Sequence, residues 1–94
     1  MDKKHYKLIL YIAGNSRKSI SATNNLKKYC EEHLKGIYTI EIVDLSKRPE
    51  LAARDQIFAT PTLIKKLPDP IKILIGDLSK EKEFLVGLNL LEST

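Results

Sequence analysis

The sequence predicts a single α/β domain over residues 1–94. Residues 6–13 form a nearly continuous run of apolar side chains, as in a strand that is covered on both faces. Residues 19–35 repeat apolar side chains at the three- and four-residue spacing of an amphipathic helix. Residues 37–45 return to β-branched side chains with partial alternation, which indicates a second strand. Short connections between these elements predict a right-handed parallel crossover.

The first helix has start and stop signals in the sequence. Gly14 tolerates the positive φ of a turn, and Asn15 or Ser16 can cap the helix that follows. Gly36 is a natural C-terminal stop.

Composition limits the class of protein. With 94 residues, of which 43% are hydrophobic, the chain can build one small core. It has no apolar run near the ~18 residues of a membrane span, and residues 1–5 lack the apolar region of a signal peptide, so we expect a cytoplasmic protein. The net charge of +4 is more typical of a solvated surface than of a nucleic-acid interface.

The sequence offers no group for catalysis. A dithiol oxidoreductase would carry reactive cysteines in the turn at residues 14–19, which contains no thiol. The single cysteine, Cys30, falls on the inward stripe of the predicted helix, where a buried apolar role is expected. His5 and His33 are far apart in sequence and have no further ligand at metal-binding spacing. We therefore expect no enzymatic activity, no metal and no cofactor.

Residues 58–64 (FATPTLI) organise the second half of the chain. Pro61 has no N–H to donate, so it marks the first residue of a strand or a kink, and its bond to Thr60 can be cis. This Thr-Pro-Thr element, followed by an apolar pair, resembles the cis-proline loop of the thioredoxin fold.

The elements around this loop complete the topology. Residues 49–54 predict a short helix, because a proline and an acidic residue are favoured in the first turn. Residues 71–75 predict a strand that stops at Gly76, and Ser79 is a candidate N-cap for the last segment. The resulting order, βαβ followed by αββα, predicts a thioredoxin-like fold.

Two segments of the second half allow two interpretations. Residues 80–92 fit both a helix and a strand. The apolar residues on one face are Phe84, Leu85, Leu88 and Leu91 in a helix, or Phe84, Val86, Leu88 and Leu90 in a strand. Gly87 costs a helix about 1 kcal/mol relative to alanine. Residues 62–67 are equally open between a strand and a short helix. Such ambiguity is common in single sequences, and it is also expected of a segment with two packings of similar free energy.

Seven segments together resemble the KaiB family in order and spacing. They are LYIAGN (10–15), GIY (36–38), VDL (43–45), RPELA (48–52), ATPTL (59–63), IGDLS (75–79) and GLNLL (87–91). The resemblance implies a non-enzymatic regulatory protein that binds a ring-shaped KaiC-type ATPase and modulates its phosphorylation state, with a KaiA-like protein as a further partner. It also implies two folds, namely a tetrameric or dimeric resting form with a rearranged C-terminal half and a thioredoxin-like monomer that binds the ATPase.

The sequence departs from the KaiB pattern at several positions. Asn89 replaces a usual aspartate, Glu92 replaces an aromatic residue, and residues that are basic in clock relatives are here Ser21, Gln56 and Ile73. We therefore expect a divergent member, from a stress or signalling system rather than a daily circadian rhythm.

Six residues are assigned to the switch and to the partner surface. Pro61, Gly87 and Asn89 are the candidate fold-switch residues, because slow X-Pro isomerisation and a weakened terminal helix affect the exchange between forms. Lys65, Lys66 and Lys72 are candidate contacts for an acidic partner, with a solvated surface as the equal alternative. Other functions left open are a thioredoxin-like interaction module without a KaiC partner and a weak nucleic-acid binder.

Overall fold

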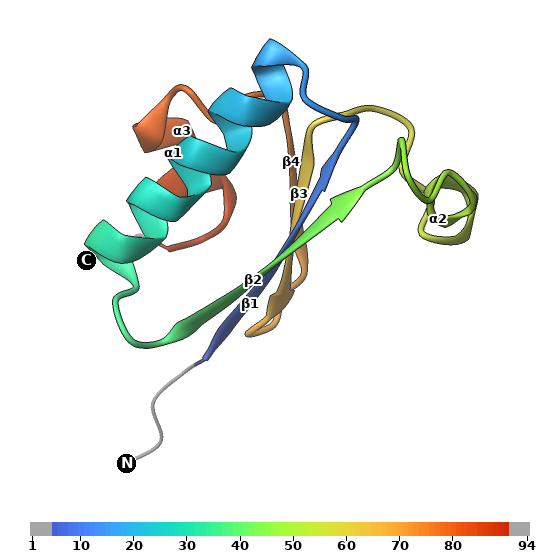
Figure 1. Cartoon of the computed structure of the whole chain (residues 1–94). Coiled ribbons are helices and arrows are strands. Elements are labelled where there is room, and N and C mark those ends of the chain that lie inside the picture. The colour runs from blue at the N-terminus through green and yellow to red at the C-terminus, as the bar shows by residue number, and fades with distance from the viewer. Residues whose placement is uncertain (1–4, 91–94) are drawn as a thin grey trace.

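The computed structural model describes residues 5–90 and contains one four-stranded sheet with the strand order β2-β1-β3-β4 (Figure 1). The strands are β1 (Tyr6–Ile12), β2 (Tyr38–Asp44), β3 (Thr62–Leu67) and β4 (Lys72–Ile75), and the helices are α1 (Arg17–His33), α2 (Glu50–Arg54) and α3 (Glu81–Gly87). β1 pairs with β2 in parallel, while β3 is antiparallel to both β1 and β4. This topology confirms the predicted thioredoxin-like α/β fold.

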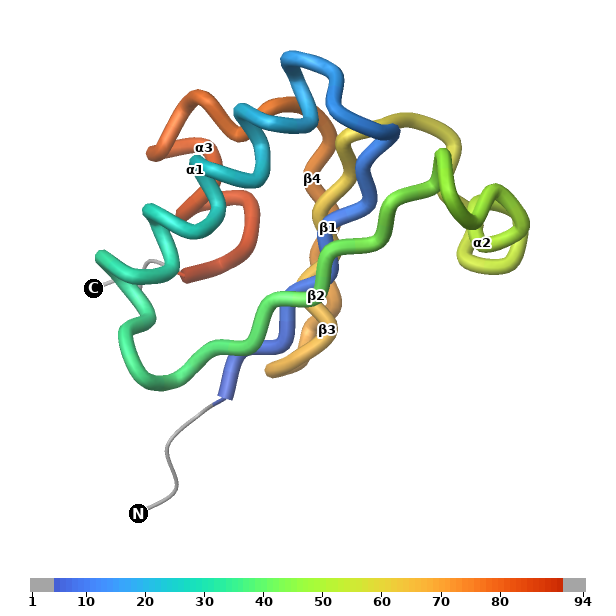
Figure 2. Tube along the Cα trace, viewed as in Figure 1, coloured from blue at the N-terminus to red at the C-terminus, as the bar shows by residue number. Residues whose placement is uncertain are grey.

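The two faces of the sheet are covered unequally. Figures 1 and 2 show α1 and α3 together on one side and α2 on the other. The larger core lies between the sheet and the helices α1 and α3, and it includes Leu8, Leu10, Leu26, Leu63 and Phe84. The smaller core lies on the opposite face and consists of Ile9, Tyr11, Ile57 and Ile64. No helix within residues 5–90 is long and apolar enough to span a bilayer.

α1 forms as the sequence predicts. Ser16 is its N-cap, and the Ser16 Oγ accepts a hydrogen bond from the Ser19 N–H at 3.2 Å. The apolar stripe that contains Leu26 and Tyr29 is buried against the sheet. Cys30 is also fully buried, and this burial raises the pKa of its thiol to about 12. The thiol is therefore protonated and acts as a small apolar group.

The structure selects one interpretation for each ambiguous segment. Residues 62–67 form the strand β3, and the last segment contains the helix α3. Phe84 and Leu88 are buried whereas Val86 is 59% exposed, which matches the helical stripe; Leu91 lies outside the described residues.

The predicted N-cap of the last helix is wrong. α3 begins after Lys80, whose side chain makes no capping hydrogen bond. The Ser79 N–H instead donates to Asp77 Oδ1 at 3.0 Å, so Ser79 takes part in an Asx turn that precedes the helix.

Candidate functional site: the switch residues and the partner surface

Pro61 connects the loop before β3 to the end of β4. The Thr60–Pro61 bond is cis, in agreement with the resemblance to the thioredoxin loop. The Pro61 carbonyl oxygen accepts a hydrogen bond from the Gly76 N–H at 2.9 Å. Pro61 is also fully buried. This residue therefore fixes the position at which the edge strand β4 ends.

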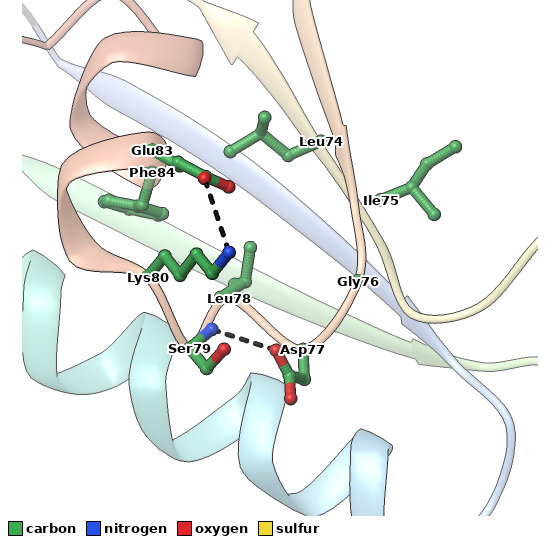
Figure 3. Close-up of a pocket in the computed structure, with 9 residues that line it drawn as sticks. All are labelled: Leu74, Ile75, Gly76, Asp77, Leu78, Ser79, Lys80, Glu83 and Phe84. Carbon is green, nitrogen blue, oxygen red and sulfur yellow. Dashed lines mark hydrogen bonds and ion pairs between the residues drawn. The ribbon is translucent and has the colours of Figure 1, made fainter.

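Gly87, the last residue of α3, packs against the face of β4 that carries Leu74. A Cβ atom added to Gly87 would lie 2.5 Å from Leu74 Cδ2 and 3.3 Å from Leu74 Cγ. Leu74 also lines a cavity of about 180 Å³ between β4 and α3, shown in Figure 3. Pro61 and Gly87, which are far apart in sequence, thus meet the same segment at residues 74–76.

Asn89 ends α3 in a Schellman motif. Its backbone is left-handed with a φ of 60°, a conformation that asparagine tolerates better than most residues. The Asn89 N–H donates to the Val86 carbonyl at 3.0 Å, and the Leu90 N–H donates to the Leu85 carbonyl at 2.8 Å. Asn89 therefore belongs to the structure that stops the helix, although its side chain is exposed.

The three candidate lysines do not form one surface. Lys65 is only 2% exposed and lies opposite Leu8 and Lys72 in the strand ladders, on the face that α1 and α3 cover. Lys72 is half-buried, and Lys66 is exposed on the other face of β3. The interior position of Lys65 corrects the expectation that it can contact a partner in this form.

The face of β4 that points away from α3 carries exposed apolar side chains. Ile73 and Ile75 are 58% and 68% exposed, and Figure 3 shows Ile75 and Leu74 on opposite sides of the strand. Lys66 lies on the same face of β3. We call Lys66, Ile73 and Ile75 the open-face surface. Phe58, in the loop before β3, is 93% exposed. Exposed apolar side chains that lie next to one another on one face, as Ile73 and Ile75 do, make this face a candidate interaction surface.

The loop from β4 to α3 is held by side chains of α1 that the sequence analysis did not identify. Leu78 has a left-handed φ of 61°, and its carbonyl oxygen accepts a hydrogen bond from the Tyr29 hydroxyl at 2.7 Å. The neighbouring Asp77 carbonyl accepts from the Asn25 amide at 2.9 Å. The spacing of apolar residues places Asn25 on an outer face of the helix. A hydrogen bond from a side chain to a distant backbone carbonyl leaves no pattern in the sequence, so this contact could not be predicted.

A cluster of possible metal ligands was also missed. Glu32 and His33 on α1 meet Glu81 on α3, and one ligand atom from each residue lies within 4.8 Å of the others. The His33 Nε2 is 2.7 Å from Glu81 Oε2, and this hydrogen bond lowers the pKa of the Glu81 carboxyl. The fold thus brings a carboxylate from a distant part of the sequence next to His33. Glu32, His33 and Glu81 could together hold a divalent cation.

A charged contact joins β1 to the end of α2. The Tyr11 hydroxyl donates to Asp55 Oδ2 at 2.8 Å, and the Arg54 Nε donates to Asp55 Oδ1 at 2.8 Å. These bonds, that of Arg54 first, lower the pKa of Asp55 to about 2. Burial, with the Asp55 bond, raises the pKa of Tyr11 to about 12. This contact anchors α2 in its position.

The turn after β1 is held by hydrogen bonds to the Asp44 carboxylate. The Gly14 N–H donates to Asp44 Oδ1 at 2.9 Å, and the same oxygen accepts from the Ser46 hydroxyl at 2.7 Å. These bonds, that of the Ser46 hydroxyl first, lower the pKa of Asp44. The turn that would hold reactive cysteines in a dithiol oxidoreductase is therefore a hydrogen-bonded structural element in this chain.

Comparison with known proteins identifies the family. The KaiB domain model matches residues 9–90. The chain belongs to the KaiB family. It is 48% identical over 89 residues to the circadian clock oscillator protein KaiB of Microcystis aeruginosa, covering 95% of this chain and 86% of that relative. It is 47% identical to the oscillator protein KaiB1 of a Synechocystis strain, covering 95% of this chain and 85% of that relative.

Similar solved structures agree with the fold of this KaiB-family chain. The N-terminal domain of SasA from Synechococcus elongatus has a TM-score of 0.73 at 15% identity, covering 100% of this chain and 92% of that one. Chloroplastic thioredoxin z has a TM-score of 0.76 at 17% identity, covering 92% of this chain and 78% of that one. The matched KaiB domain includes Pro61, Gly87 and Asn89, so all three candidate switch residues lie within the family's shared region.

Proposed function

We propose that this KaiB-family protein is a non-enzymatic regulator that binds a KaiC-type ATPase ring and modulates its phosphorylation state. The observation that carries the proposal is the family match over residues 9–90, which spans both halves of the chain. The relatives are named circadian clock oscillator proteins, which supports a role in a clock or in a signalling system derived from one. The protein would act in the cytoplasm, with a KaiA-like protein as a third component.

The mechanism we propose is an equilibrium between two forms. In the resting form the C-terminal half is rearranged and the protein is a tetramer or dimer. The thioredoxin-like monomer binds the ring, so the apparent affinity is reduced by the fraction of molecules in the competent form. Binding to the ring then draws the population toward that form. The short helix α3 and the backbone conformations of Leu78 and Asn89 support a second half of low intrinsic stability.

The partner surface we propose is the open-face surface together with Phe58. It combines exposed apolar area with the positive charge of Lys66, so it suits a partner that presents apolar side chains with an acidic residue at their edge. Lys72 is a secondary contact because it is half-buried, and Lys65 is not included in this form.

The experiment that tests the function is a measurement of molar mass by size-exclusion chromatography with light scattering. The free chain is expected to elute as an oligomer. Addition of a hexameric KaiC-type ATPase with nucleotide should move it into a complex with the ring. An Ile73→Asp, Ile75→Asp double variant should lose the complex, while a variant with Ile20→Asp, an exposed isoleucine of α1, serves as the matched control. Absence of a complex with each nucleotide would refute the proposed function.

A thioredoxin-like interaction module without a KaiC partner is the second candidate. Ser21 and Gln56 favour it, because the resemblance to the KaiB family implies basic residues at these positions in clock members. Binding of the chain to other proteins of the same signalling system, in the absence of any ATPase ring, would distinguish this candidate from the KaiC-binding regulator. Weak nucleic-acid binding stays a prediction that a salt-dependent shift with single-stranded DNA would test.

A further inference from the structure

α1 presents three polar side chains to the segment that leads from β4 into α3. Asn25, Tyr29 and His33 are four residues apart, so they lie along one side of the helix. Their partners, in order, are the Asp77 carbonyl, the Leu78 carbonyl and the Glu81 carboxylate. The partners also follow one another along the chain, so one helix holds the whole start of the last element at three successive points.

We propose that Asn25, Tyr29 and His33 form a clamp, here called the α1 clamp, that sets how often the segment from residue 76 through α3 leaves its place on α1. The proposal deepens the function above and rests on it, because release of this segment is the first step that a change to the resting form requires. In the proposed equilibrium, the clamp residues belong to the half that keeps its fold, and their partners belong to the half that is rearranged.

The central contact of the clamp is the Tyr29 hydroxyl. The ring of Tyr29 packs against Phe84 with a centroid distance of 4.8 Å, and its hydroxyl bond to Leu78 is buried. Without the hydroxyl, the Leu78 carbonyl would lose this donor in the interior, whereas in a released segment it would bind water. Removal of the hydroxyl alone should therefore favour release and leave the ring contact in place.

The local backbone explains why this segment needs a clamp. Leu78 has the left-handed φ that only glycine and asparagine adopt readily, and α3 has no side-chain cap. A helix of seven residues is too short to be stable without tertiary contacts. The hydrogen bonds from α1 therefore supply specificity for this arrangement that the segment's own sequence does not supply.

Native-state hydrogen exchange on the full-length chain, diluted until light scattering shows the monomer, tests the proposal. In Tyr29→Phe we expect protection of the Phe84 and Leu88 amides to fall about tenfold, and in Asn25→Ala about threefold, with unchanged protection in β1 and β2. The control for Tyr29→Phe is Tyr38→Phe, which removes a hydroxyl that bonds Glu31 within the first half. The control for Asn25→Ala is its exposed neighbour, Asn24→Ala.

The outcomes separate a clamp from a general loss of stability. A selective loss of protection in α3 in both clamp variants, with neither control showing it, supports the proposal. An equal loss in α3 and β1, or no loss in α3, would overturn it, and if Tyr29→Phe does not fold, Asn25→Ala decides alone. The experiment contains no ATPase, so ring capture can fail while the clamp is demonstrated, and the reverse can also occur.

Discussion

The two halves of this molecule differ in how far their own local sequence determines their structure. The first half has two seven-residue strands and a 17-residue helix that Ser16 caps. The second half has a four-residue strand, a seven-residue helix without a side-chain cap, and left-handed backbone at Leu78 and Asn89. Long, capped elements are specified largely by their own sequence, whereas short ones depend on what they pack against. The comparison teaches that the second half takes its conformation from the first.

Truncation of the core residue of α3 should have the largest effect. Phe84 is fully buried against Tyr29, so Phe84→Ala is expected to cost about 3–5 kcal/mol, and α3 should lose exchange protection before β1 and β2 do. Urea unfolding and amide exchange measure the two effects. Val86→Ala is the matched control on the same helix, and its 59% exposed side chain predicts a change within about 0.5 kcal/mol. A similar loss of unfolding free energy in the two variants would contradict the view that the second half depends on its packing against the first.

Gly87→Ala tests the balance between local preference and packing. Alanine gains about 1 kcal/mol of helix propensity, but its Cβ requires Leu74 to move toward the adjoining cavity. We expect a net shift toward the helical form of less than about 1 kcal/mol, and the full gain only in a Leu74→Ala background. Amide chemical shifts of residues 80–90 report the shift. If those resonances do not move in either background, the prediction fails.

Two Schellman motifs allow a matched test of the end of α3. Asn89 and Gln56 occupy the same left-handed position after α3 and α2, with φ values of 60° and 58°. Asn89→Ala should destabilise the second half by about 1 kcal/mol, because asparagine tolerates this conformation and alanine does not. Gln56→Ala should be nearly neutral, because neither residue is favoured there. Thermal unfolding measures both, and equal effects would refute this explanation.

The smallest expected effect concerns acid stability and acts outside the second half. The folded-state pKa of Asp55 is lowered to about 2, so its contribution is fully present above its unfolded pKa of about 4 and is lost as the pH falls toward 2. Asp55→Asn should therefore flatten the decline in stability between about pH 4 and 2. Tyr11→Phe keeps the Arg54 bond and should retain part of the slope. Denaturant midpoints across this pH range provide the measurement.

Much of the first half could be predicted from the sequence because its signals are local. The continuous apolar run of β1, the stripe of α1 and the burial of Cys30 all follow from periodicity. The cis-proline loop of the second half was identified for the same reason, because a proline between two threonines before an apolar pair is a local pattern. These features depend on neighbours within a few residues of one another.

The second half could be predicted only in part, because distant contacts decide it. Helix and strand periods fit α3 equally well, and the interpretations differ at Leu85, which packs inward, and Val86, which is exposed. The bond from Asn25 to the Asp77 carbonyl joins residues that are 52 positions apart. Lys65 was predicted as a contact for an acidic partner or as part of a solvated surface, and only the sheet order shows that its neighbours on both sides are strands.

The difference in accessibility between Lys65 and Lys66 can be used to measure how often the second half opens. Lys65 and Lys66 are neighbours in β3, yet the side chain of Lys65 is buried and that of Lys66 is exposed to solvent. An amine-modifying reagent should therefore tag Lys66 at once and reach Lys65 only in molecules whose second half has come apart. The ratio of the two tags, read by mass spectrometry, counts those molecules.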